Sequence, residues 1–160
     1  MNTSWRQRIF KVKEQSQKIE HMKKREPVKN IMSTQMITLD RTHSLDDAEQ
    51  LFKKHNIRHI PVVSGDSLIG MLSLTDLLRI SFVDNYDDNE GNVDSAVYNM
   101  LSIEQVMVSK PVAVEANQTI REVAEILSTK EFHALPVTEE NKLVGIVTTT
   151  DLIKYLLDQY

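Results

Sequence analysis

The chain contains no cysteine among its 160 residues, which excludes disulfide bonds and thiolate metal ligands. No apolar run approaches the roughly 18 residues of a membrane-spanning helix, and no secretory signal is visible, so a cytoplasmic location is the expectation. With 41% hydrophobic and 26% charged residues, the composition is that of an ordinary globular protein. The length suits one compact domain or two small intertwined units.

Motifs typical of enzymes and metal sites are also missing. No nucleophile–base pair, paired-carboxylate motif or glycine-rich phosphate loop occurs, and His55 and His59 straddle a predicted helix end and strand. The acidic segment 84–92 lacks the alternating ligands and closing glutamate of a calcium loop, which favours an exposed linker. We therefore expect no enzyme activity, no catalytic residue and no metal site.

Positive charge is concentrated at one end of the chain. The net charge is −4, but residues 1–26 carry eight Lys or Arg against three acids, which leaves −9 for the rest. No glycine or proline occurs from Trp5 to Lys24, and apolar residues there fall near one stripe, which predicts a basic, modestly amphipathic helix ending before Pro27. This helix is expected to pack on the body or on a second subunit. No motif supports a contact of residues 1–26 with nucleic acid or a membrane, so we do not expect one.

An internal repeat accounts for most of the chain. Residues 28–80 align with residues 103–155 at a constant offset of 75, without a gap. The apolar pattern is preserved almost throughout, so two copies of one fold unit are predicted. Identical residues at this offset include Met32 and Met107, Pro61 and Pro136, Gly70 and Gly145, and Asp76 and Asp151.

Each copy predicts the order β-α-β-β-α. A short strand (36–39; 111–114) precedes a helix that begins with a capping box at Ser44 or Thr119. The next strand (57–63; 132–138) carries a proline near its middle, so it should be an edge strand or be free on one side at that point. The residues expected to be buried on the first helix of each copy are Leu45, Ala48, Leu51 and Phe52, and Ile120, Val123, Ile126 and Leu127. A helical turn or more is expected within residues 94–107.

The last strand and helix of each copy share one pattern, at residues 68–77 and 143–152. An apolar run broken by glycine closes with hydroxyl-x-hydroxyl-Asp, after which a helical pattern begins. Unpaired N–H groups at such a helix start form a natural site for an anion or a hydroxyl group. The structural alternative is that Thr75 and Thr150 are helix caps, each followed by a carboxylate that is favourable in the first turn. Its occurrence in both copies favours a site that is used twice.

Two units with an x-h-P-V strand and a Gly-h-h-Ser/Thr-x-Thr-Asp ending resemble a tandem pair of CBS domains, a Bateman module. The resemblance covers residues 28–157. It implies an α/β fold of the α+β kind, in which the two units pack by their sheets about a pseudo-twofold axis, plus the N-terminal helix. The expected segments are a basic helix (1–27), a first CBS domain (28–83), an acidic linker with a short helix (84–102) and a second CBS domain (103–160).

In that family, clefts between the two units often bind adenosine-containing ligands. The resemblance therefore implies a regulatory or sensor module for AMP, ADP, ATP or a related adenosyl compound, with no obligatory cofactor. The implied ribose carboxylates are Asp76 and Asp151, with contacts to ribose or phosphate from Ser73, Thr75, Thr148 and Thr150. Phosphate contacts are implied for Arg58, His59 and His133. Backbone and apolar groups around Ile37, Ile60, Val112 and Leu135 would flank the adenine.

These residue types suit such a ligand. A carboxylate accepts two hydrogen bonds from a cis-diol, and arginine or protonated histidine donates charge-assisted hydrogen bonds to phosphate oxygens. The alternatives are that Arg58 is a surface cation on an edge strand and that His133 is an ordinary strand histidine. Ala134 stands in the second copy where the first copy has His59, so the two clefts are expected to differ.

A second function class is a structural or interaction protein with degenerate clefts and no ligand. For both classes a homodimer is expected, because a CBS pair normally leaves apolar helix faces for a second pair. The residues predicted for that surface are Leu77, Leu78, Leu152 and Leu156. An unidentified protein that the module regulates is the other expected partner.

Overall fold

The computed structural model describes residues 10, 11, 13, 14, 25–82 and 100–159. Of the predicted N-terminal helix, residues 10, 11, 13 and 14 fall in this range and are helical. Arg25 and Glu26 also fall in it and are not helical, so the predicted extension of the helix to Pro27 is wrong. The rest of that helix, the acidic linker 84–92 and the segment 94–99 lie outside the described residues. Within the described part, no helix is both long enough and apolar enough to cross a membrane.

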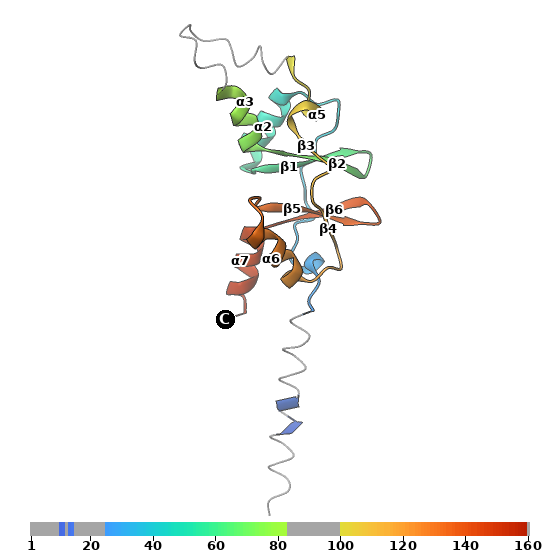
Figure 1. Ribbon diagram of the computed structural model, residues 1–160, viewed down its shortest axis with the longest axis vertical. Coiled ribbons are helices and arrows are strands. Elements are labelled where there is room, and N and C mark those ends of the chain that lie inside the picture. Colours follow the sequence, from blue (N-terminus) through green and yellow to red (C-terminus); the bar gives the residue numbers. More distant parts are fainter. Residues whose placement is uncertain (1–9, 12, 15–24, 83–99, 160) are drawn as a thin grey trace, which may run out of the picture.

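The two copies form the same four main elements in the same order. The first copy contains α2 (Leu45–His55), β1 (His59–Ser64), β2 (Ser67–Ser73) and α3 (Leu74–Phe82). The second copy contains α6 (Ile120–Thr129), β5 (Ala134–Glu139), β6 (Lys142–Thr148) and α7 (Thr149–Leu157). Shorter elements are the 3-10 helix η1 (Val28–Asn30), α5 (Ile103–Val106), β3 (Val108–Ser109) and β4 (Val114–Glu115). Figure 1 shows the two hairpins facing each other at the middle of the molecule, with the helices on their outer sides.

The strands form one sheet in the order β1-β2-β6-β5-β4, with β3 paired to β2. Antiparallel pairing aligns His59 with Ser73 in the first hairpin and Ala134 with Thr148 in the second, so the register repeats at the offset of 75. A single pair, Ser67 with Lys142, joins the hairpins. The predicted duplication is therefore a duplication of geometry as well as of sequence.

The first predicted strand of each copy is shorter than its sequence pattern indicates. Residues 36–39 form a single parallel bridge at Leu39, and the strand predicted at 111–114 is Val114–Glu115. Leu39 N donates to Pro61 O at 3.0 Å, and Val63 N donates to Leu39 O at 2.8 Å. The next bond of this ladder would require an N–H group on Pro61, which proline lacks. The prediction that the proline strand is free on one side at that point is confirmed, and the same feature shortens its neighbour.

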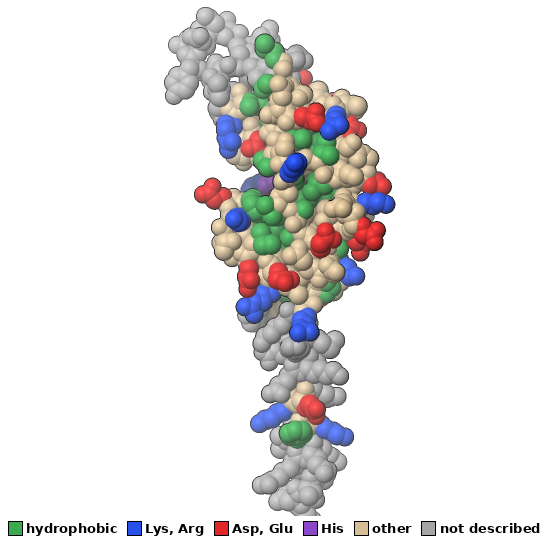
Figure 2. Space-filling view, turned by 45° about the vertical axis from the view of Figure 1, so that its right-hand side comes forward, with side chains coloured by type: hydrophobic (Ala, Val, Ile, Leu, Met, Phe, Trp, Pro, Cys, Tyr) green, Lys and Arg blue, Asp and Glu red, His purple; other side chains and the backbone are tan. Residues whose placement is uncertain are grey.

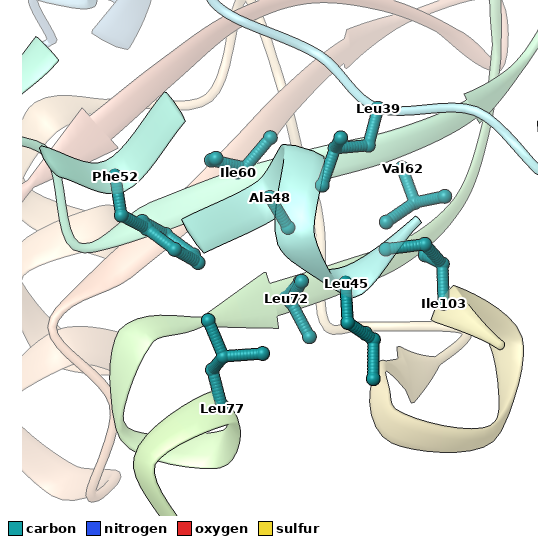
Figure 3. Close-up of a cluster of buried hydrophobic side chains, with 9 residues drawn as sticks. All are labelled: Leu39, Leu45, Ala48, Phe52, Ile60, Val62, Leu72, Leu77 and Ile103. Carbon is teal, nitrogen blue, oxygen red and sulfur yellow. The ribbon is translucent and has the colours of Figure 1, made fainter. Parts of the chain in front are cut away.

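Each copy has its own apolar core, and six of the eight predicted buried helix positions are confirmed. Figure 3 shows the first core between α2, the hairpin and α3. Leu51 and Ile126 are only partly buried, at the margins of the two cores. Leu77 is 1% exposed within the first core, and Leu152 packs against the second. The assignment of Leu77 to a dimer surface is therefore wrong, because its side chain is buried in the core, whereas Leu152 is only partly buried and its assignment stays a prediction.

The first residues of each copy pack on the other copy. Val28 is fully buried in the second core, and Ile103 lies in the first core with 1% exposure. Met32 packs against Gly145, and a β-carbon added to this glycine would overlap the Met32 side chain. The reciprocal contact of Met107 with Gly70 has the same form. The two units are thus intertwined, because each core includes the first residue of the other copy.

The predicted capping boxes are confirmed at the first helix of each copy. Asp47 N donates to Ser44 Oγ at 3.1 Å, and Ser44 N donates back to Asp47 Oδ2 at 2.9 Å. Thr119 and Glu122 exchange the equivalent bonds at 3.2 and 2.8 Å. These donors hold the pKa of Asp47 and of Glu122 below the ordinary range. The first turn of both helices is therefore closed by its own side chains.

Candidate functional site

The repeated junction between strand and helix is closed by a hydrogen-bonded cap in both copies. Thr148 N and Thr148 Oγ1 donate to Asp151 Oδ2 at 2.8 and 2.7 Å, and Asp151 N donates to Thr148 Oγ1 at 3.3 Å. Ser73 and Asp76 exchange the same three bonds in the first copy. One oxygen of each carboxylate is therefore already engaged in holding the helix start.

The prediction that Thr75 and Thr150 cap these helices is wrong. Both residues lie one position inside the first turn, with exposed side chains, because α3 begins at Leu74 and α7 at Thr149. A hydroxyl residue three positions before an acid is the spacing of a capping box, and it was present in the sequence at Ser73 and Thr148. The exposed hydroxyl groups of Thr75 and Thr150 therefore do not cap these helices.

The second oxygen of the two carboxylates differs between the copies. Asp76 Oδ1 lies 3.5 Å from a guanidinium nitrogen of Arg79. Within the described part of the chain, Asp151 Oδ1 has no hydrogen-bond or ion-pair partner. The residue equivalent to Arg79 is Lys154, which is exposed. Sequence reasoning missed Arg79, although its spacing of three from an acid on a helix is the signal for such a pair.

Positively charged groups from both copies meet near Asp76. His59 is half-buried at the start of β1, opposite Ser73. Burial lowers the pKa of His59, the charge of His133 lowers it further, and the nearby carboxylate of Asp76 opposes both effects. Arg58 adds a smaller repulsion that also lowers the pKa of His59. The structure thus brings together three predicted residues of the first copy and one of the second.

Backbone hydrogen bonds hold the positive side chains at the strand–helix junctions. Leu74 N donates to Arg58 O at 2.9 Å, and Thr149 N donates to His133 O at 3.0 Å. Arg58 and His133 are exposed, and no carboxylate of the described residues pairs with Arg58. Figure 2 shows a histidine recessed in a hollow between the two halves of the molecule. The junctions of both copies therefore present cationic groups beside the capped carboxylates.

The four apolar residues predicted to flank an adenine fall into two classes. The side chain of Ile37 is half-buried, and that of Val112 is 48% exposed. The side chains of Ile60 and Leu135 are 0% and 1% exposed, because they point into the helix-covered cores. The side chains of Ile60 and Leu135 therefore belong to the cores, and the backbone of these residues is the part that remains for the implied contact with an adenine.

No group of three or more His, Asp or Glu in the described segments is arranged to hold a metal ion. The geometry instead combines carboxylates, hydroxyl groups and cations, which is a donor and acceptor set for a polar, anionic small molecule.

Comparison with known proteins agrees with this geometry. The CBS domain model matches residues 28–82 and 103–158. A protein of Methanocaldococcus jannaschii, MJ1225, is 33% identical over 132 residues, which are 82% of this chain and 43% of that protein. Its crystal structure superposes with a TM-score of 0.73 at 26% identity, covering 83% of this chain and 48% of that one. The chain therefore spans less than half the length of this relative.

Shorter relatives are matched over most of their length. The CBS domain-containing protein YhcV of Bacillus subtilis is 28% identical over 125 residues, which cover 78% of this chain and 81% of YhcV. The structure of CBSX2 from Arabidopsis thaliana in complex with AMP superposes with a TM-score of 0.70, covering 84% of this chain and 98% of that one. At 21% identity the likeness to CBSX2 is one of fold.

Proposed function

The chain belongs to the CBS domain family, with two tandem CBS domains, and from that premise we propose that it is a regulatory module that binds adenosine-containing ligands at its strand–helix junctions. Its activity in this proposal is binding, and the transmitted signal is a change in how the two units pack. The residues proposed for ligand contact are Ser73, Thr75, Asp76, Thr148, Thr150 and Asp151 at the junctions, with Arg58, His59 and His133 for phosphate groups and Ile37 and Val112 beside the base.

The observation that carries this proposal is the Asp151 carboxylate. Thr148 fixes its Oδ2 through bonds of 2.7 and 2.8 Å, while Oδ1 has no partner among the described residues. An oriented, half-buried carboxylate oxygen with open lone pairs can accept from the hydroxyl groups of a ribose. The exposed hydroxyl of Thr150, one residue earlier, adds a second polar group on the same helical turn.

The first junction is proposed to bind differently. Arg79 occupies Asp76 Oδ1 at 3.5 Å, so a ribose would have to displace or share this exposed ion pair. Such pairs contribute about 0–1 kcal/mol, so the competition weakens a ligand without excluding it. The expected order of sugar binding is therefore Asp151 before Asp76.

A thermal-shift titration tests whether there is a ligand at all. AMP, ADP, ATP, S-adenosylmethionine and adenosine should each be tested, because the fold of CBSX2 with AMP supports the adenosyl class without fixing the compound. A ligand at 100 times its dissociation constant should stabilise the fold by about 2.7 kcal/mol. An unchanged melting temperature with every adenosyl compound would favour the alternative function, an interaction protein with degenerate clefts.

Asp151→Ala should weaken binding of the stabilising ligand by about 10- to 100-fold, or roughly 1.5–3 kcal/mol, because charge-assisted hydrogen bonds to the ribose are lost. Loss of the cap will also destabilise the fold by about 0.5–2 kcal/mol. Asp151→Asn keeps one side-chain oxygen for the cap and separates the two effects. Isothermal titration calorimetry and a denaturant midpoint on each variant give both quantities.

Asp46→Ala is the matched control, since Asp46 is also an acid in the first turn of a helix but lies on α2, away from the junctions. It should change stability by no more than about 1 kcal/mol and leave ligand affinity unchanged. Unchanged affinity in both Asp151 variants, with wild-type binding intact, would contradict the placement of the ribose at α7.

We also propose a homodimer, in which α3 and α7 form the contact. Leu78 on α3 is 44% exposed, and Ile153, Leu156 and Leu157 on α7 are 57%, 55% and 69% exposed. Leu78 and Ile153 are equivalent at the offset of 75, so each copy presents an apolar residue at the same helix position. Figure 1 places α3 and α7 on the same side of the molecule. One second copy could therefore cover both helices.

A further inference from the structure

His59 lies opposite Ser73, whose hydroxyl donates to Asp76, and most of the surrounding groups are basic. The groups that act on His59 are Arg58, which precedes it, His133 from the other copy and Asp76 on α3. Asp76 is itself shared with Arg79 at 3.5 Å and with the Ser73 hydroxyl. The single carboxylate of Asp76 is thus shared by several basic side chains, so bases outnumber acids around His59.

Protonation of His59 is disfavoured in the free protein. The imidazole is half-buried, and burial is the main reason that its pKa falls below the ordinary value of 6.5. Because the folded state prefers the neutral form, acidification through about pH 6.5 and below makes His59 a destabilising group. The free protein should therefore lose stability from this residue as the pH falls.

We propose that the cleft containing Asp76, His59 and His133 takes up a proton together with an anionic phosphate group, and so distinguishes a nucleotide from an uncharged adenosyl compound in a pH-dependent way. The inference rests on the proposed function, because it names the ligand class of one of its two sites.

A phosphate group bound next to His59 changes which protonation state of the imidazole is favoured. Two negative charges beside the imidazole favour its protonated form, which then donates a charge-assisted hydrogen bond to a phosphate oxygen. Proton uptake on binding requires affinity to rise as the pH falls, by at most about tenfold per pH unit for each proton. An uncharged ligand supplies no such compensation, so its binding should not gain from acidification.

The second cleft lacks this device. Ala134 occupies the position equivalent to His59, opposite Thr148. The residue equivalent to His133 is Arg58, whose guanidinium stays protonated at every accessible pH. Phosphate binding at the Asp151 junction should therefore take up no proton from these positions. The two clefts differ in pH response as well as in the state of their carboxylates.

The test is calorimetric titration of AMP and of adenosine at about pH 6 and about pH 7.5, on wild type and His59→Ala. Phosphate itself titrates near pH 6, so the quantity to compare is the ratio of AMP affinities, wild type over variant, at each pH. This ratio should increase by roughly three- to thirtyfold on going to the lower pH. The corresponding ratio for adenosine should stay constant.

His55→Ala is the matched control, because His55 is exposed at the end of α2 and takes no part in the cluster. Its ratio should be the same at both pH values. If His59→Ala fails to fold, His59→Asn replaces it, because it keeps a polar side chain without a group that titrates in this range, and it should give the same change of ratio. A pH-independent ratio with AMP still bound would overturn the inference and leave the proposed function standing. No binding of any adenosyl compound at either pH would remove the proposed function, and the inference with it.

Discussion

Replacing Ile103 by alanine is expected to destabilise the protein by about 2–5 kcal/mol, the usual cost of truncating a fully buried isoleucine. The site of the damage is the unusual part of this expectation. Ile103 is the first residue of the second copy in sequence, but its side chain is 1% exposed within the core of the first copy. In Figure 3 it lies beside Leu45 and Val62. The cavity should therefore open under α2 and β1.

A denaturant midpoint measures the size of this effect, and a double-mutant cycle measures its location. The milder Ile103→Val, combined with Leu45→Ala, should show a coupling energy of about 0.5–3 kcal/mol, because the two side chains share one cluster. Combined with Val123→Ala, in the second core, the effects should add. Met100→Ala, at a side chain that is 80% exposed, is the control for truncation near this segment. Coupling to Val123 instead of Leu45 would mean that the segments are not exchanged.

This exchange is the part of the fold that the sequence did not reveal. An alignment at constant offset pairs Val28 with Ile103 and Met32 with Met107, but it is equally satisfied whether each segment packs on its own copy or on the other one. The choice depends on tertiary contacts such as Met32 against Gly145. Periodicity within a segment carries no information about the identity of its partner.

The helices and hairpins could be predicted because their signals are local. Capping boxes at Ser44 and Thr119 begin helices at the next residue, and the proline of each hairpin limits the neighbouring ladder. The short strand before each helix was overestimated, since its end is determined by the missing N–H of a residue more than twenty positions away. Local sequence patterns therefore predict where a helix or strand lies, but the length of a strand also depends on its partner in the sheet.

The sequence predicted the residue types of the candidate site, whereas the contacts of those residues depend on distances in the folded chain. The repeat singled out Asp76 and Asp151 as equivalent, yet Arg79 lies near Asp76 Oδ1 while Asp151 Oδ1 has no partner in the described part of the chain. The side chains of Ile60 and Leu135 belong to the cores. Their strands have consecutive buried residues, so the sequence does not alternate between apolar and polar and does not show which face a given residue occupies. The sequence thus predicted a difference between the clefts from His59 and Ala134, but it did not predict the difference between the two carboxylates.

Replacing Leu157 by aspartate is expected to convert a dimer into a monomer at micromolar concentration. On α7, Ile153, Leu156 and Leu157 are spaced as i, i+3 and i+4, which places them on one helical face. All three are more than half exposed, although single copies rarely expose a continuous apolar surface. A second copy of the chain is expected to cover this surface. The position of α3 equivalent to Ile153 is the apolar, exposed Leu78, and a twofold contact uses the same patch on both partners.

An aspartate at the centre of such a contact would bury an unpaired carboxylate in each partner. Burial of this kind costs several kcal/mol, so the dimer dissociation constant should rise by at least about 100-fold. Sedimentation velocity from about 1 to 100 μM protein measures the change. Lys154→Asp introduces the same carboxylate at an exposed neighbouring position of α7 and should leave the dimer intact. A wild-type monomer throughout this range, or equal effects of the two substitutions, would contradict a dimer built on α7.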